Sequence, residues 1–135
     1  RVRMAIPVVL SILHGDDVSP EALERAAKLV SKKPDLKIYL ALIRTEQGEA
    51  DQARALLQSL AHEPTLTSLV GWFSARLYAQ RDEHAQAYEA LERARDGQLR
   101  GPLGRDPAFA TLRRDGRFRR LFPGIRNPNA SWRPR

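Results

Sequence analysis

Apolar residues recur every three or four positions over most of the first 96 residues, which is the spacing of helices that bury one face. Pro, Gly and charged clusters interrupt this pattern at short intervals. It predicts six helices, at about residues 3–14, 20–31, 35–47, 49–62, 65–80 and 83–95. Because the loops between them have no more than five residues, we expect consecutive helices to be antiparallel neighbours.

Several of these helices carry end signals. Ser19 can accept a hydrogen bond as the N-cap of the second helix, and Pro20 suits the first helical position. Gly48 is placed to end the third helix. Asp82 is expected to cap the sixth helix, which Gly97 would end.

The fourth and sixth predicted helices repeat each other at an interval of about 34 residues, a period typical of paired-helix repeats. The matching pairs are Ala53 with Ala87, Leu57 with Leu91, Leu60 with Ala94, and, ahead of these, Ala41 with Ala75 and Gly48 with Asp82. Alanines at a crossing let two helix backbones approach within about 8–10 Å. We therefore expect Ala41 to cross at Ala53, and Ala75 at Ala87. Paired helices with this period are typical of a solenoid, and the alternative is a helical bundle with chance self-similarity.

In this register the chain resembles the tetratricopeptide repeat (TPR) family over about residues 3–96, with units beginning near residues 3, 34 and 68. The resemblance implies an all-α solenoid of about three helical hairpins that binds other proteins, closed by a C-terminal capping segment as in many bacterial repeat proteins. Two positions depart from the family pattern. Arg44 stands where the third unit has the aromatic Tyr78, and Asp82 replaces the glycine of the tight turn.

The resemblance also implies a partner-binding groove along the first helix of each unit. Trp72 and Arg76 lie one helical turn apart, and both residue types are common at binding hot spots. The alternative is that Trp72 belongs to the core under the capping segment. The family's lysine and asparagine clamp for a terminal carboxylate is absent, so we expect an amphipathic helix or an extended peptide as partner. The implied groove residues are Ile38, Leu42, Thr45, Glu46, Leu69, Trp72, Arg76 and Gln80.

Residues 97–122 read as a capping segment. Gly97, Gly101, Pro102 and Gly104 predict a loop, and Asp106-Pro107 predicts a capped helix start. Phe109 and Leu112 would share one apolar face, and Phe118, Leu121 and Phe122 another. Pro, Asn and Arg dominate residues 123–135, which predicts an extended or disordered tail.

The charge of the chain is concentrated at its C-terminal end. Of the net charge of +7, residues 1–96 contribute −1, with 13 Lys and Arg against 14 Asp and Glu, while residues 97–135 contribute +8. Arginine clusters bind phosphate backbones and anionic headgroups, so nucleic acid or an anionic membrane surface is the alternative partner. The arginines of this basic patch are Arg113, Arg114, Arg117, Arg119, Arg120 and Arg126.

Signals for catalysis are weak throughout the chain. The chain has no nucleotide-binding glycine loop and no nucleophile elbow, and its lack of cysteine excludes disulfides. His14, His62 and His84 stand alone near predicted helix ends, so we expect neither a metal nor another cofactor. The sequence therefore favours a non-enzymatic interaction module, either an adaptor or the sensing part of a larger bacterial protein.

Overall fold

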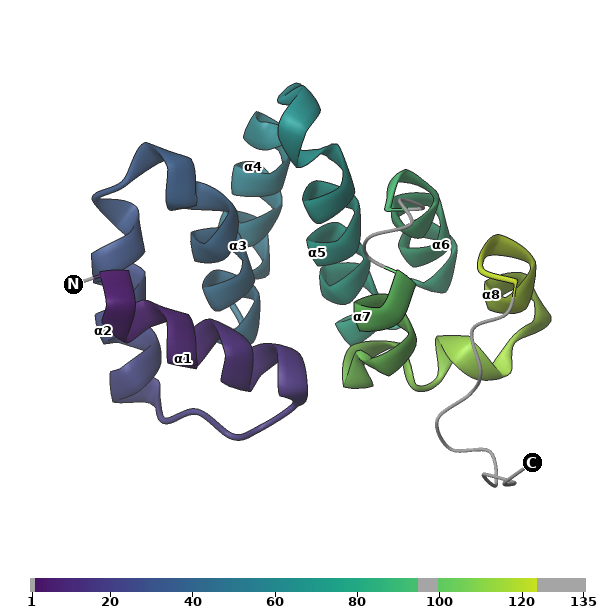
Figure 1. The fold of residues 1–135 in the computed structure, drawn as a ribbon, viewed down its shortest axis with the longest axis horizontal. Coiled ribbons are helices and arrows are strands. Elements are labelled where there is room, and N and C mark those ends of the chain that lie inside the picture. Colours follow the sequence, from purple (N-terminus) through teal and green to yellow (C-terminus); the bar gives the residue numbers. More distant parts are fainter. Residues whose placement is uncertain (1, 95–99, 124–135) are drawn as a thin grey trace.

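The computed structural model describes residues 2–94 and 100–123, which fold as helices without strands (Figure 1). The chain is all-α over this part. The α-helices are α1 (Val2–His14), α2 (Pro20–Ser31), α3 (Lys37–Glu46), α4 (Ala50–Leu60), α5 (Thr67–Gln80), α6 (His84–Arg93), α7 (Arg100–Arg105) and α8 (Gly116–Leu121). The short 3-10 helices are η1 (Pro34–Leu36), η2 (Pro64–Leu66), η4 (Pro107–Phe109) and η5 (Leu112–Arg114).

The start of α2 follows the sequence signals. The amide N–H of Ala22 donates to Ser19 Oγ at 3.2 Å, and Pro20 occupies the first helical position. The third and fifth predicted helices each begin with a 3-10 turn, η1 and η2. The predicted end of the sixth helix at Gly97 lies outside the described residues.

Three helices end in the same left-handed turn. Gly15 after α1, Gly48 after α3 and Asp82 after α5 have φ angles of 81°, 80° and 57°. In each turn the following amide N–H bonds a carbonyl five positions back, which closes the helix end. These bonds are Asp16 to Ser11, Glu49 to Arg44 and Glu83 to Tyr78, each at 2.9 Å. Equivalent turns thus recur along the chain at nearly equal intervals.

This geometry corrects the predicted role of Asp82. The residue that precedes α6 is Glu83, and its side chain makes no capping hydrogen bond. Asp82 instead takes the left-handed conformation that Gly48 takes in the preceding turn. Asp tolerates this conformation better than most residues because its short polar side chain can bond locally.

The interval of about 34 residues is present between the turns at Gly48 and Asp82, but not between the N-terminal ends of the helical segments that precede them. η1 begins at Pro34 and η2 at Pro64, which is a shorter interval than that from Gly48 to Asp82. α5 has 14 residues and α3 has 10, so α5 contains one additional turn at its N-terminal end.

Helices α3 and α4 form one closely packed pair, and α5 and α6 form another (Figure 1). The predicted crossing residues Ala41, Ala53, Ala75 and Ala87 are all fully buried. The second pair contains a further close approach at Gly71. A Cβ added there would lie 2.7 Å from the carbonyl oxygen of Ala90. The pairing of α5 with α6 therefore requires glycine at this position.

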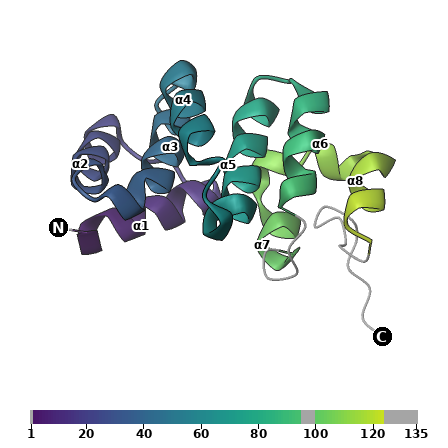
Figure 2. The ribbon, with the colours of Figure 1, turned by 90° about the horizontal axis from the view of Figure 1, so that it is seen from above.

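Helix α1 departs from the expected antiparallel hairpin. It packs on α2 and α3, and Figure 1 shows it running across the middle of α2 toward the lower end of α3. Figure 2 places α1 and α7 on the same side of the α3–α5 row, opposite α4. This orientation of α1 brings its C-terminal turn to the capping segment, where Gly15 lies against Pro107.

The capping segment is more helical than its composition predicts. α7 spans residues 100–105, where we expected a loop. Pro102 falls in the first turn, where a helix needs no amide donor, and Leu103 is fully buried. Tertiary packing of Leu103 thus outweighs the low helix propensity of the neighbouring glycines. Phe109, Leu112, Phe118 and Phe122 are buried as predicted, and Leu121 is partly buried.

None of the described helices has the length and apolar character needed to cross a membrane.

Candidate functional site

The structure places most of the implied groove residues in the interior. Glu46 and Gln80 are exposed, and Leu69 is half-buried. The buried members are Ile38, Leu42, Thr45, Trp72 and Arg76. Trp72 is 6% exposed and Arg76 is 3% exposed, so neither side chain is presented broadly to solvent.

Trp72 and Arg76 both bond the buried carboxylate of Asp106, a residue that the sequence predicts only as a helix cap. The indole Nε1–H of Trp72 donates to Asp106 Oδ2 at 2.6 Å. Arg76 Nη1 donates to Asp106 Oδ1 and forms an ion pair with it. Asp106 also performs the predicted capping, because the Ala108 amide donates to Oδ1 at 2.9 Å. The one-turn spacing on α5 places both donors against one acceptor.

This buried network ties both ends of the described chain to α5. Arg76 Nη2 donates to the carbonyl oxygen of Ile12 at the end of α1, at 3.3 Å. Arg113 Nη1 donates to the backbone oxygen of Asp106 at 2.6 Å. Burial is the main cause that lowers the pKa of Arg113, and the charge of Asp106 opposes it. Through these bonds, α1 and the capping segment are both attached to the side of α5 that carries Trp72 and Arg76.

An apolar groove remains open between α1, α3 and α5. Its volume is about 420 Å³, and no charged residue is found among the described residues that line it. Ile6 and Leu10, one turn apart on α1, are 52% and 48% exposed and border this groove. Among residues 5–94 and 103–123, no other large hydrophobic residue is exposed. Leu69 and Trp72 of the implied groove lie in its wall, together with Tyr39 and Phe73.

The predicted basic patch is divided by the fold. Arg113 is buried, while Arg114, Arg117, Arg119 and Arg120 are exposed around η5 and α8. The guanidinium group of Arg117 lies 4.7 Å from the ring centroid of Tyr88, which is a cation–π distance. Arg126 lies outside the described residues.

The aromatic residues interleaved with these arginines face inward. Phe118 and Phe122 are buried, and their ring centroids lie 5.1 Å apart. Their rings are therefore not available for stacking on nucleic-acid bases. Asp115 caps α8 by accepting from the Arg117 amide at 3.0 Å, and this bond is the main cause that lowers its pKa.

Among the described residues, no three His, Asp or Glu side chains lie close enough together to hold a metal ion. No family model matches the chain, and no curated protein or solved structure matches it. Function is therefore inferred from the surfaces of the fold.

Proposed function

We propose that this chain is a non-enzymatic protein-recognition module, built from TPR-like helical pairs, that binds the apolar face of an amphipathic helix. The observation that carries the proposal is the apolar groove between α1, α3 and α5, bordered by exposed Ile6 and Leu10. A contiguous exposed apolar surface is a mark of an interaction site. The repeated turns at Gly15, Gly48 and Asp82 support the repeat interpretation.

The chemistry of the groove favours a helix over an extended peptide. An added strand needs an open backbone edge, and the described part of the chain has no strand to provide one. A helix requires only apolar side-chain contact, made by residues at i, i+3 or i+4 and i+7. Burying one large aliphatic side chain contributes ~1.5–3 kcal/mol when it starts fully exposed. Half-exposed Ile6 and Leu10 therefore contribute less than this each.

A selection of helical peptides against the intact chain tests the proposal. Selected peptides should carry apolar residues on one face, and their affinity, measured by fluorescence anisotropy, should fall at least about tenfold with Leu10→Glu. Gln80→Glu is the matched control, because Gln80 is exposed and does not line the groove. Peptides that bind Leu10→Glu and the native chain equally well would rule out this groove.

A second candidate function rests on the exposed arginines of the capping segment. Arg114, Arg119 and Arg120 are exposed, and the nearby phenylalanines are buried. Such a surface suits contact with the phosphates of a nucleic acid rather than stacking on its bases. The test is binding of a labelled oligonucleotide at rising salt. The triple change of these arginines to Gln should flatten the salt dependence, and an unaltered slope would reject this function.

A further inference from the structure

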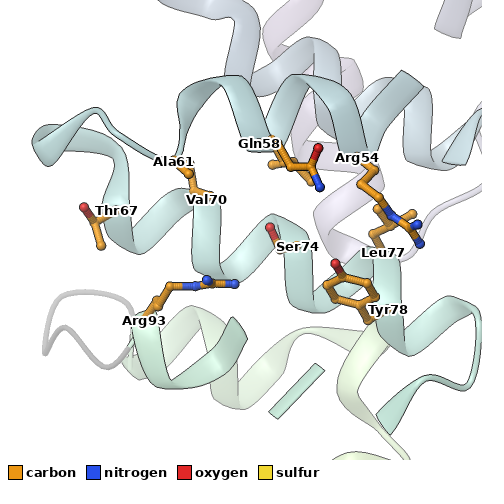
Figure 3. Close-up of a pocket in the computed structure, with 10 residues that line it drawn as sticks. Arg54, Gln58, Ala61, Thr67, Val70, Ser74, Leu77, Tyr78 and Arg93 are labelled. Carbon is orange, nitrogen blue, oxygen red and sulfur yellow. The ribbon is translucent and has the colours of Figure 1, made fainter. Parts of the chain in front are cut away.

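A second pocket lies between α4, α5 and α6, and its lining is cationic and polar. Its volume is about 240 Å³. Arg54 of α4 and Arg93 of α6 line it, with Gln58, Ser74 and Tyr78 (Figure 3). In Figure 3 the Arg93 side chain points toward Ser74 from one end of the pocket, and Arg54 lies at the other end, beside Leu77 and Tyr78. Apolar side chains such as Leu57 and Val70 complete the wall.

The helical period of α5 separates this pocket from the apolar groove. The α5 residues of the pocket recur at helical spacing along one face, and they are Thr67, Val70, Ser74, Leu77 and Tyr78. Leu69, Trp72 and Phe73 face the apolar groove instead. At about 100° per residue these two sets point to different sides of the helix. The pocket is therefore independent of the surface used in the proposed function.

The positive charge in this pocket has no acidic counterpart in the described structure. Within the described ranges, no Asp or Glu lines the pocket. Among the ion pairs between described residues, none includes Arg54 or Arg93. The Nε atom of Arg54 is buried and has no hydrogen-bond partner among these residues. A buried donor without a partner is unfavourable, so an acceptor that reaches this atom would be bound more tightly.

Arg54 is held in place by its surroundings. Its guanidinium carbon lies 5.7 Å from the ring centroid of Tyr78, which is within cation–π distance. Ser74 is 6% exposed and lies one helical turn before Tyr78 on the same face of α5. A pre-positioned arginine loses less entropy when it binds an anion.

We propose that this pocket binds a phosphate group. Arg54 and Arg93 together carry two positive charges, which balance the two negative charges of a phosphate dianion. A carboxylate carries only one negative charge. Arginine presents paired N–H donors that fit phosphate oxygens in a two-bond arrangement. The hydroxyl of Ser74 and the amide of Gln58 supply further neutral donors to the remaining oxygens. The apolar wall gives room for a small organic group attached to the phosphate.

Titration of the full chain with inorganic phosphate, followed by amide and arginine side-chain NMR signals, tests this assignment. Saturable shifts are expected at Ser74, at Arg54 Nε–H and at Arg93 Nε–H. Arg93→Gln should weaken phosphate binding by about tenfold. Arg93 is exposed, so this variant keeps the fold intact, whereas Arg54→Gln changes a partly buried side chain. Acetate, titrated in parallel, should bind more weakly than phosphate.

Two matched controls make the test decisive. Arg25→Gln on α2 removes the same charge from an exposed site outside the pocket. Arg119→Gln removes it from the exposed arginines of the capping segment. Equal weakening by these variants and by Arg93→Gln would show general attraction to a basic protein and overturn the proposal. Shifts centred on α8, or equal affinity for acetate, would overturn it as well. Neither outcome bears on peptide binding in the apolar groove.

Discussion

The indole of Trp72 and the carboxylate of Asp106, 34 residues apart in the sequence, are joined by a buried hydrogen bond of 2.6 Å. The same carboxylate pairs with Arg76, whose other terminal nitrogen bonds the end of α1 at Ile12. The Asp106–Arg76 pair thus joins three separate segments of the chain. Asp106 is 2% exposed, so its charge depends on these partners for compensation.

Replacement of Asp106 by Asn should strongly destabilise the fold. The variant leaves the guanidinium group of Arg76 buried without its anion, and breaking a buried pair in this way costs about 3–5 kcal/mol. The free energy of unfolding, from urea denaturation followed by circular dichroism, measures the loss.

Trp72→Phe is the graded comparison, because it removes the indole donor to Asp106 and some buried volume but retains an aromatic ring and the Arg76–Asp106 pair. We expect a loss of roughly 1–3 kcal/mol, smaller than that of Asp106→Asn. If both variants unfolded as the native chain does, the network would contribute nothing to stability.

Gly71→Ala should separate α5 from α6. The added Cβ would lie 2.7 Å from the Ala90 carbonyl oxygen and 2.9 Å from the Ala94 amide nitrogen, both of which are backbone atoms. Overpacking of a well-packed core costs about 1–3 kcal/mol. Thermal unfolding should show a lower midpoint for this variant, and Gln86→Ala on the exposed face of α6 serves as control. If Gly71→Ala unfolded at the same temperature as Gln86→Ala, the close approach of α5 to the α6 backbone at Gly71 would be contradicted.

The helices could be predicted from sequence because their signals are local. Apolar spacing, the Ser19 cap and the Gly48 turn each act within a few residues, and the observed boundaries of α1 to α6 fall close to the predicted ones. Gly15 precedes Gly48 by nearly the same interval as Gly48 precedes Asp82. This spacing could have extended the predicted repeat to the first two helices.

The arrangement around Asp106 could not be predicted in the same way. The Asp106-Pro107 dipeptide is a complete local signal for a cap, and nothing in it indicates that the other carboxylate oxygen meets α5. The position of α1 depends on the same long-range contact through Arg76. The helix α7 depends on the burial of Leu103, whereas the neighbouring glycines and proline predict a loop.

Exchange of the turn residues at positions 48 and 82 should change stability in opposite directions. Asp82 has φ 57°, which costs an L-residue about 1–2 kcal/mol in general and Asp less, so Asp82→Gly should stabilise the chain slightly. Gly48→Asp should destabilise it, although a Cβ at Gly48 would meet none of the described atoms within 4 Å. The lack of such contacts means that a loss of stability in urea denaturation of this variant does not come from a clash of the new Cβ. Effects of the same sign at both positions would contradict the equivalence of the two turns.

Alkaline pH should weaken the attachment of the capping segment through Tyr88. Burial raises the pKa of Tyr88 to about 12, and the negative charge of Asp115 acts in the same direction. The phenol donates to the Leu112 carbonyl at 3.2 Å, so the folded state favours the protonated form. In the unfolded chain the phenol has its ordinary pKa of about 10.

The sign of the effect follows from these two pKa values. Above pH ~10 the unfolded chain releases a proton that the folded chain retains, so unfolding becomes more favourable as pH rises. The contribution of Tyr88 to stability is complete below pH ~10 and is lost as pH rises through the folded pKa of about 12. Urea denaturation at pH 9, 10.5 and 11.5 should show this decline. Tyr88→Phe should start less stable at pH 9, because it lacks the bond to Leu112, and then decline less. A parallel decline in both proteins would exclude Tyr88 as the titrating group.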